Sequence, residues 1–139
     1  MNEKLVFKEK IYTYQIDFVG HVNNIVYIQW MENGRINLLE AIDLPAFDLA
    51  AKEGIVPVLT KTSIRYRKPY FLNNTVVVEI WISQLNNASA IMDFNFKNEK
   101  GELCATGQQT GLFVDRQTMR PVRLSEKYRE AFEKYLIPN

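Results

Sequence analysis

The chain has 139 residues, of which 47% are hydrophobic and 24% are charged, a balance typical of a folded globular protein and not of a disordered one. Its 17 basic and 16 acidic residues leave a net charge of +1, without the basic excess expected of a nucleic-acid-binding protein. A single cysteine, Cys104, excludes an internal disulfide and a cysteine metal cluster, and the length predicts one domain over residues 1–139.

The first ten residues, MNEKLVFKEK, mix charged and apolar side chains and lack the apolar core of a signal peptide. No stretch of the sequence approaches the ~18 consecutive apolar residues of a membrane-spanning helix. The lone cysteine fits a reducing compartment. We therefore expect a soluble protein of the cytoplasm.

The first predicted elements are a strand and a long helix. Residues 5–16 are rich in strand-forming side chains, and near their end Tyr12, Tyr14 and Ile16 alternate with polar residues. From about residue 24 to residue 40 the polar and apolar side chains follow a helical period, and either Asn23 or Asn24 is placed to cap the first turn. Polar residues form only a narrow stripe on this helix, which predicts that it is buried on several sides.

The second half of the chain is rich in predicted strands. Pro45 to Lys52 is expected to form a short helix that ends at Gly54. Strands are predicted over residues 56–67, 75–85, 88–97 and 103–114, with turns at Asn86-Asn87 and at NEKG, residues 98–101. Residues 125–136 are predicted to form a terminal amphipathic helix capped by Ser125. This order predicts an α+β fold in which an antiparallel sheet of about five strands wraps around one long helix.

Asp17 lies between the predicted strand and the predicted long helix. The first backbone N–H groups of a helix have no partner within the helix, and the helix dipole adds partial positive charge there. Such a place can polarise a carbonyl group as an oxyanion hole does, while a nearby carboxylate acts as a base or a nucleophile. Gly20 has no side chain, so the carbonyl group of a ligand can approach the backbone closely.

Simpler explanations of these residues stay open on the local sequence alone. An aspartate or an asparagine before a helix often only caps the helix or turns the chain. His21, the only histidine, is more simply explained as a hydrogen-bonding group in a turn than as a catalyst. Because no second histidine or cysteine pair accompanies it, we expect neither a metal nor another cofactor. The glycine-rich loops of nucleotide-binding proteins and the G-x-S-x-G of serine hydrolases are also missing from the sequence.

The pattern Y-x-x-D-x-x-G-H-V-N-N-x-x-Y, from Tyr14 to Tyr27, resembles the hot-dog-fold acyl-CoA thioesterases, specifically the 4-hydroxybenzoyl-CoA thioesterase group. Its HVNN segment is also similar to the acyl-ACP thioesterases of plants and bacteria. The stretch SIRYRKPYFLNNTVVVEIWI, residues 63–82, resembles a second signature of the family. The order of the predicted elements agrees as well, so the resemblance extends over residues 8–114.

The resemblance implies a hot-dog fold and a thioester hydrolase. In the family, an aspartate at the position of Asp17 attacks the thioester carbonyl or activates a water molecule. A backbone N–H near the start of the helix, here that of Asn24, polarises the same carbonyl close to Gly20. Three further residues are expected to support the loop: His21, Asn23 and Tyr27.

Several departures from the family pattern leave the subfamily open. Gln15 stands where many relatives carry a further aspartate, and Val19 stands where the acyl-ACP enzymes often carry an asparagine. After Pro69, the sequence FLNNT replaces a Gly-Asp turn. Another hot-dog branch carries its carboxylate within the helix, and Glu32 is the candidate for that arrangement. Its place on the polar stripe explains Glu32 more simply as an i,i+3 ion-pair partner of Arg35.

A CoA ester carries phosphate groups, so basic residues are expected near the site. The densest basic stretch is RYRK, residues 65–68, where strand alternation places Arg65 and Arg67 on one face and Tyr66 on the other. A solvated strand face explains these arginines equally well. The expected substrate-binding residues are Trp30, Arg65, Tyr66, Arg67 and Lys68, and the candidates for lining an acyl pocket between helix and sheet are Tyr27, Trp30 and Met31.

Three functions are weighed on this basis. The leading one is an acyl-CoA thioesterase without a metal, the second is an acyl-ACP thioesterase, and the third is a non-catalytic hot-dog protein that binds acyl-CoA. The exposed edges of a wrapped sheet are usually paired or covered. By resemblance we expect a homodimer or a homotetramer, and no nucleic-acid partner.

Overall fold

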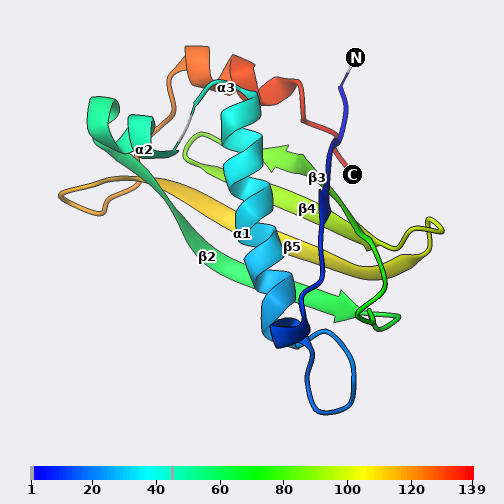
Figure 1. Ribbon diagram of the computed structural model, residues 1–139. Coiled ribbons are helices and arrows are strands. Elements are labelled where there is room, and N and C mark those ends of the chain that lie inside the picture. The colour runs from blue at the N-terminus through cyan, green and yellow to red at the C-terminus, as the bar shows by residue number, and fades with distance from the viewer. Residues whose placement is uncertain (1, 45) are drawn as a thin grey trace.

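The computed structural model describes residues 2–44 and 46–139, which form an antiparallel sheet and a long helix (Figure 1). The strands of these residues are β1 (Leu5–Glu9), β2 (Ile55–Tyr66), β3 (Val76–Leu85), β4 (Ser89–Lys97) and β5 (Leu103–Asp115). They lie in the order β1-β3-β4-β5-β2, and each neighbouring pair is antiparallel. The predicted α+β architecture is confirmed, with β1 and β2 at the two edges of the sheet.

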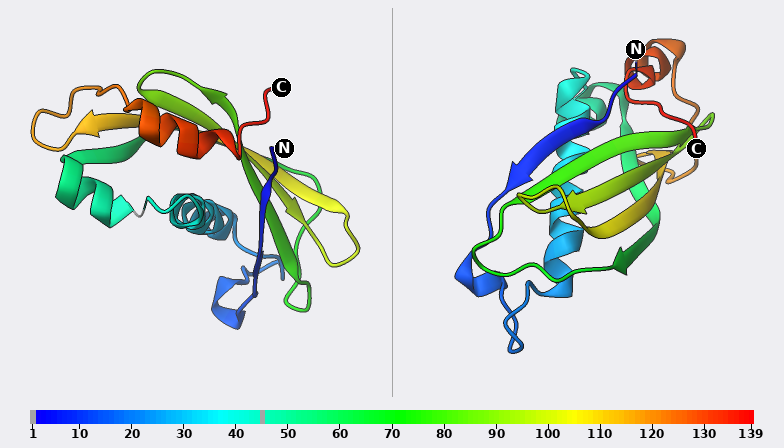
Figure 2. Two further views of the ribbon diagram at one scale, coloured as in Figure 1. Left: turned by 90° about the horizontal axis from the view of Figure 1, so that it is seen from above. Right: turned by 90° about the vertical axis from the view of Figure 1, so that its right-hand side faces the viewer.

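The long helix α1 (Asn24–Ala41) lies across one face of the sheet, and the curved sheet wraps around it (Figure 2). Its buried residues are Val26, Tyr27, Trp30, Met31, Gly34, Leu38 and Leu39. They pack with inward-pointing side chains of the strands, among them Phe94 and Phe96 of β4, in one apolar core. Alternation along β4 supplies this layer, because every second side chain of a strand points to the same face.

The prediction that α1 is buried on several sides is wrong. Ile25, Ile28 and Ile36 are 64%, 47% and 39% exposed, although they are as apolar as the buried residues of the helix. Residues at these spacings lie in one stripe, and the sheet covers the opposite side of the helix. An exposed apolar stripe of this kind marks a surface that a partner can cover.

The first strand is shorter than predicted. β1 ends at Glu9, and a short 3-10 helix, η1 (Thr13–Gln15), replaces the expected extended chain. The side chain of Gln15 accepts a hydrogen bond from the backbone N–H of Tyr12 at 2.8 Å, and the backbone N–H of Gln15 donates to the carbonyl oxygen of Tyr12 at 2.9 Å. These local bonds close a turn, so the alternation of Tyr12, Tyr14 and Ile16 does not form a strand.

The predicted second helix is present over its described residues, while Pro45 lies outside them. The helix α2 (Ala46–Asp48) continues into a π-helical turn, η2 (Leu49–Glu53). Gly54 ends this turn as expected, with a φ of 66° and its N–H donating to the carbonyl oxygen of Ala50 at 3.2 Å.

The terminal helix α3 (Glu126–Glu133) is present but shorter than predicted. Ser125 caps it through its backbone oxygen, which accepts hydrogen bonds from later N–H groups, and not through its side chain. Phe132 of α3 meets Phe113 of β5 with ring centroids 5.9 Å apart, which covers this end of the core. Among the residues that the structure describes, no helix has the length and apolar character needed to cross a membrane.

Both predicted hairpin turns are confirmed. Between β3 and β4, the backbone N–H of Asn86 donates to the carbonyl oxygen of Ser89 at 2.8 Å. Between β4 and β5, the backbone N–H of Asn98 donates to the carbonyl oxygen of Glu102 at 3.0 Å. These short connections keep β3, β4 and β5 adjacent, and β2 joins the far side of β5.

Gly34 allows α1 to lie close to the sheet, and replacing it should weaken the fold. A Cβ atom at this position would lie 3.0 Å from Cε2 of Phe94 and 3.2 Å from Cζ of Phe7. We expect Gly34→Val to lower the free energy of unfolding by about 1–3 kcal/mol, because the added groups displace these rings. Gln29→Val, on the exposed side of the same helix, is the control and should change it by at most about 0.5 kcal/mol. Denaturant unfolding measures both, and equal stability of the two variants would show that α1 does not press on the sheet.

Candidate functional site

The loop before α1 is a tight turn. Ile16 and Val22 form an antiparallel bridge across it, and the backbone N–H of Asp17 donates to the carbonyl oxygen of His21 at 2.8 Å. Gly20 has a φ of +85°, and its N–H donates to the carbonyl oxygen of Asp17 at 3.0 Å. Only glycine adopts this φ at little cost, so the residue that was expected to give access to the backbone also shapes the turn.

The two oxygens of the Asp17 carboxylate have different environments. Oδ1 accepts hydrogen bonds from the backbone N–H groups of Val19 at 3.0 Å and His21 at 3.3 Å. For Oδ2, no hydrogen-bond partner is found within residues 2–44 and 46–139. One oxygen therefore holds the turn, while the other remains available to a ligand. Asp17 can therefore stabilise the turn through one oxygen and act as a base or nucleophile through the other.

The start of α1 is capped by Asn23. Its side-chain oxygen accepts a hydrogen bond from the backbone N–H of Ile25 at 3.0 Å, and its carbonyl oxygen accepts one from Val26 at 3.0 Å. The backbone N–H of Asn24 has no partner among the described residues. It is an unpaired donor at the positive end of an 18-residue helix, which favours negative charge on a bound group.

Asp17 and Asn24 border one pocket of about 220 Å³, which we call the loop pocket. Its other walls come from α1 and from the end of β2 with the segment that follows. The lining residues are Asp17, His21, Val22, Asn24, Tyr27, Tyr66, Arg67, Lys68 and Pro69. The fold thus joins two segments of the sequence analysis that lie far apart in the chain. No group of three or more metal-ligating side chains is found in the part of the chain that the structure describes.

The inner wall of the loop pocket is aromatic. The ring of the buried Tyr27 meets those of Tyr66 and Tyr70 at centroid distances of 5.0 and 5.9 Å. Burial raises the pKa of Tyr27, and it also raises the pKa of Tyr66, above the usual value of about 10. Both phenols therefore keep their protons at neutral pH and act as neutral hydrogen-bonding groups beside the carboxylate.

Arg67 and Lys68 border the loop pocket, but Arg65 does not. β2 ends at Tyr66. The backbone N–H groups of Arg67 and Lys68 both donate to the carbonyl oxygen of Cys104, at 2.8 and 3.0 Å, which turns the chain. Arg65 borders a different pocket that shares no residue with the loop pocket. The two arginines, which were expected on one face of the strand, thus border different pockets, and Arg67 lies beyond the end of the strand.

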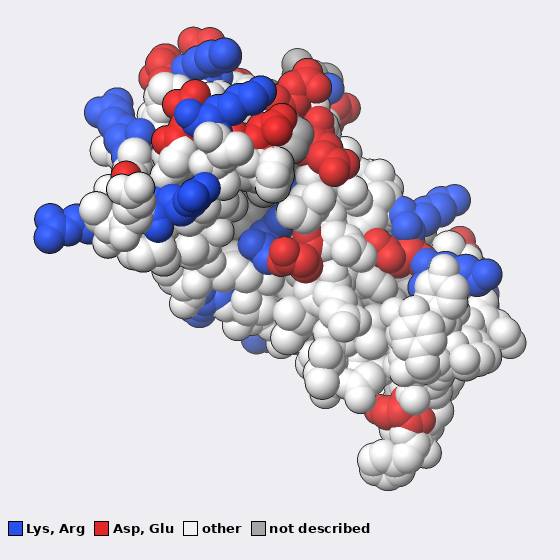
Figure 3. Space-filling model, turned by 60° about the vertical axis from the view of Figure 1, so that its left-hand side comes forward, with Lys and Arg blue, Asp and Glu red and all other residues white. Residues whose placement is uncertain are grey.

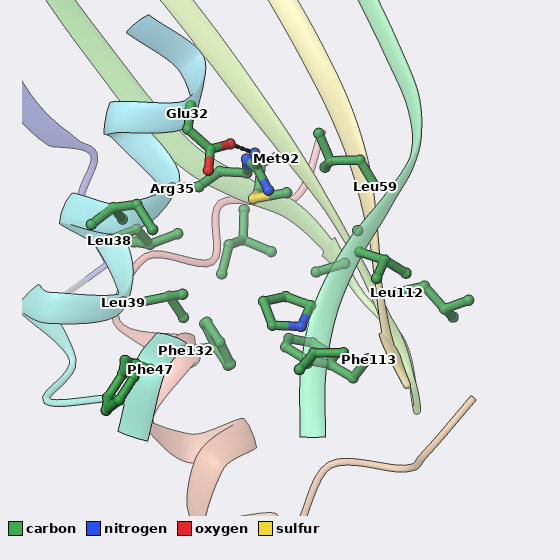
Figure 4. Close-up of a pocket in the computed structure, with 17 residues that line it drawn as sticks. Glu32, Arg35, Leu38, Leu39, Phe47, Leu59, Met92, Leu112, Phe113 and Phe132 are labelled. Atoms are coloured by element: carbon green, nitrogen blue, oxygen red, sulfur yellow. Dashed lines mark ion pairs between the residues drawn. The ribbon is translucent and has the colours of Figure 1, made fainter. Parts of the chain in front are cut away.

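Trp30 and Met31, which were expected to line an acyl pocket with Tyr27, lie fully in the core and do not border the loop pocket. Glu32 forms the expected ion pair with Arg35. Both charged residues border a larger cavity between α1 and the sheet (Figure 4). The sequence analysis expected an acyl pocket in this place but did not identify these two residues as lining it. The available signal was the position of Arg35 four residues after Met31, because this spacing places the arginine beside the buried face of the helix.

Comparison with known proteins gives consistent matches. Residues 11–132 match the family described as the Thioesterase-like superfamily. The long-chain acyl-CoA thioesterase FadM of Escherichia coli (strain K12) is 29% identical over 125 residues, which cover 89% of this chain and 93% of FadM. The chloroplastic acyl-acyl carrier protein thioesterase ATL3 of Arabidopsis thaliana is 28% identical over 128 residues, which cover 91% of this chain and 66% of ATL3.

Among solved structures, the DHNA-CoA thioesterase from Staphylococcus aureus superposes with a TM-score of 0.86 at 24% identity. The superposition covers 94% of this chain and 89% of that protein. It confirms the predicted hot-dog fold. The family match confirms the resemblance that the motifs of residues 14–27 and 63–82 indicated.

The buried phenol of Tyr27 should make stability depend on pH in the alkaline range. Below pH ~10 the phenol is protonated in both the folded and the unfolded chain, so its contribution is fully present. Above that pH the unfolded chain loses the proton while the folded protein keeps it, because the pKa of Tyr27 is raised in the folded state. The free energy of unfolding should therefore fall with rising pH, by up to about 1.4 kcal/mol per pH unit for this group.

Tyr27→Phe should show a shallower fall than the wild-type protein. Tyr14→Phe, which removes an exposed hydroxyl, is the control. Denaturant unfolding at a series of alkaline pH values measures the slopes. Identical slopes for the wild-type protein and Tyr27→Phe would show that this phenol is not buried as described.

Proposed function

The chain belongs to the Thioesterase-like superfamily, and we propose that it hydrolyses acyl-CoA thioesters in the loop pocket. This family membership supports the enzyme class predicted from the sequence, a thioester hydrolase. The observation that carries the proposal is that Asp17 and Asn24 border the same pocket, while Oδ2 of Asp17 and the backbone N–H of Asn24 have no partner among the described residues. Hydrolysis of a thioester needs a hydrogen-bond donor to the carbonyl oxygen and an activated oxygen atom that attacks the carbonyl carbon. The N–H of Asn24 can serve as the donor, and Asp17 can supply or activate the attacking oxygen.

In the proposed reaction, the thioester carbonyl oxygen accepts a hydrogen bond from the N–H of Asn24. Negative charge builds on that oxygen as the tetrahedral intermediate forms, and the dipole of α1 stabilises it. In one form of the mechanism, Oδ2 of Asp17 attacks the carbonyl carbon, the C–S bond breaks, and water cleaves the resulting anhydride. In the other, Asp17 takes a proton from the water molecule that attacks. Both forms yield a carboxylic acid and the thiol of CoA.

The remaining loop residues position these two groups. A Cβ atom at Gly20 would have no protein atom within 4 Å, so the space beside the loop is open to a ligand. The ring of His21 packs edge-on against the ring of Phe71, with centroids 5.2 Å apart. The backbone carbonyl oxygen of His21 accepts a hydrogen bond from the backbone N–H of Asp17. We therefore assign a positioning role to His21 and Asn23, and the chemical role to Asp17.

The phosphate groups of CoA are proposed to bind at Arg67 and Lys68, which are exposed at the edge of the loop pocket. Lys68 pairs with Glu102 in an exposed ion pair, which a phosphate group can displace at little cost. An acidic acyl carrier protein would meet the same two residues, and the similarity to ATL3 favours this second candidate. Comparing the hydrolysis rates of one acyl group on each carrier separates the two.

We further propose that residues 1–139 form one domain and that the protein acts in the cytoplasm. We also propose that this domain pairs with a second copy of the chain through β2 and α1. The 12-residue strand β2 is at an edge of the sheet, and α1 exposes Ile25, Ile28 and Ile36. The space-filling view shows an area with few charged side chains along the lower part of this face (Figure 3). Pairing with a second copy covers a strand edge and an apolar stripe together. A monomeric mass in light scattering would rule this assembly out.

The role of Asp17 is tested by Asp17→Asn. The amide oxygen still accepts the N–H groups of Val19 and His21, so we expect the turn and the fold to persist. The amide is a poor nucleophile and base, so kcat/KM should fall at least about 100-fold. Release of free thiol from short, medium, long and aromatic acyl-CoAs is the measurement.

Asp43→Asn makes the same chemical change at an exposed turn after α1 and serves as the control. Asparagine tolerates the left-handed conformation of this residue, so full activity is expected. Near-full activity of Asp17→Asn would contradict the mechanism. Tight binding of acyl-CoAs without turnover by the wild-type protein would instead favour a non-catalytic binding function.

A further inference from the structure

The turn before α1 carries two exposed apolar side chains that the proposed reaction does not use. The backbone N–H of Gly20 donates to the carbonyl oxygen of Asp17 at 3.0 Å, so Phe18 and Val19 are the two central residues of a tight turn. This turn projects beyond the start of α1 at one end of the molecule (Figure 1). Phe18 is fully exposed there, and Val19 is 56% exposed.

Two other segments bring exposed apolar side chains to the same end of the molecule. Tyr12 and Tyr14 are exposed and stack on each other, with ring centroids 5.5 Å apart. Phe71 and Leu72, which follow β2, are each about half exposed. We call these six side chains the apolar tip: Tyr12, Tyr14, Phe18, Val19, Phe71 and Leu72. Single exposed apolar residues are common on protein surfaces, whereas a cluster marks a surface that binds a partner.

Contacts between the three segments hold the apolar tip together. The ring of His21 in the turn packs edge-on against the ring of Phe71, with centroids 5.2 Å apart. The backbone N–H of Asn23 donates to the carbonyl oxygen of Gln15 at 2.8 Å, which ties the turn to the segment that carries the two tyrosines. The cluster is therefore one surface and not three separate exposures.

The shape of the apolar tip fits a fluid partner. Because Phe18 is fully exposed, its ring does not pack against the rest of the described chain. A Cβ atom at Gly20 would have no protein atom within 4 Å, so the space beside this ring is open as well. A lone projecting ring needs a matching pocket in a protein partner, but lipids rearrange around it. Tyrosine side chains, with an apolar ring and a polar hydroxyl, suit the boundary between lipid headgroups and acyl chains.

Basic side chains border the apolar tip. Nζ of Lys10 lies 5.5 Å from the centroid of the Tyr12 ring, and Arg67 lines the loop pocket together with Asp17. Both basic residues are exposed, and neither belongs to an ion pair found within residues 2–44 and 46–139. Asp17 is the only acidic residue in the segments that carry the tip. Exposed cations beside an apolar surface attract anionic lipid headgroups.

The apolar tip also lies next to the proposed site of hydrolysis. Asp17 and His21 border the loop pocket, while Phe18 follows Asp17 in the chain and the ring of Phe71 contacts that of His21. A protein bound through this tip holds the loop pocket close to the bilayer. Long acyl chains enter bilayers because their apolar groups leave water, so long-chain acyl-CoAs are concentrated at the same place.

We propose that the apolar tip binds the surface of an anionic lipid bilayer. Phe18 and Val19 insert among the lipids, and Lys10 and Arg67 face the headgroups. The lipid contact itself does not depend on hydrolysis. Its use, which is to bring the loop pocket to membrane-bound acyl-CoAs, rests on the thioesterase function proposed above.

The first test is flotation of the protein with two kinds of vesicle, phosphatidylcholine alone and an equal mixture with phosphatidylglycerol. Binding to the anionic vesicles should be at least about tenfold stronger than to the neutral ones, and added salt should weaken it. Phe18→Ser should reduce binding to the anionic vesicles at least about tenfold. Phe47→Ser is the control, because Phe47 is also highly exposed but lies on α2, beyond the other end of α1 (Figure 1).

The charge contribution is tested by Lys10→Gln. Binding to the anionic vesicles should fall several-fold, while binding to the neutral vesicles should not change. Lys127→Gln is the matched control, because Lys127 is also exposed and its Nζ lies 5.9 Å from the ring centroid of Tyr128, but it lies on α3. If Phe18→Ser fails to fold, as circular dichroism would show, the wild-type lipid preference and Lys10→Gln decide the question.

The outcomes separate this inference from the proposed function. A wild-type protein that hydrolyses acyl-CoAs but floats with neither vesicle would overturn the inference alone. Equal loss of binding in Phe18→Ser and Phe47→Ser would also overturn it. A halved mass of Phe18→Ser in light scattering, without lipid binding by the wild-type protein, would assign the tip to a contact between two copies instead. Lipid binding without hydrolysis of any acyl-CoA would overturn the proposed function and support the membrane contact.

Discussion

The packing of α1 against the inner face of the sheet is the constraint on which both pockets depend. Trp30 and Met31 are buried against the strands and fix the rotation of the helix, while Gly34 allows the rings of Phe94 and Phe7 to lie close to its backbone. With the rotation fixed, the first turn of α1 faces the loop pocket and its second half faces the larger cavity that Glu32 and Arg35 border. The side chain of Arg35, which would be exposed to water on a free helix, therefore lies at the wall of this cavity and is largely buried. Burying its charged guanidinium costs free energy.

The start of α1 is anchored on several sides, which makes its unpaired N–H a fixed donor. The backbone N–H of Val22 donates to the carbonyl oxygen of the buried Tyr70 at 3.0 Å, and that of Asn23 donates to Gln15 at 2.8 Å. The turn built on Asp17 is part of the same segment, so the carboxylate and the donor keep their relative position. Groups that are in place before the substrate arrives need no reorganisation during the reaction, which is how such sites stabilise developing charge.

Patterns among neighbouring residues predicted most of the fold, because these features depend on local spacing. They also predicted a helix cap at Asn23 or Asn24, and the structure shows that Asn23 is the cap. The same reasoning failed between Tyr12 and Gln15, where a side-chain to backbone bond closes a turn that alternation alone does not reveal. The meeting of Asp17 with the helix start was predictable because the residues are close in sequence. The lining of the larger cavity between α1 and the sheet was not, because its residues come from several segments whose separation no local pattern sets.

The central claim is that the loop pocket binds the thioester with its carbonyl at the start of α1. The most direct measurement is a crystal structure of the protein with a non-hydrolysable ketone analogue of an acyl-CoA. The account predicts that the carbonyl oxygen lies within about 3 Å of the backbone nitrogen of Asn24, with Oδ2 of Asp17 facing the carbonyl carbon. An analogue bound with its carbonyl outside the loop pocket, or with Asp17 turned away from it, would contradict the account.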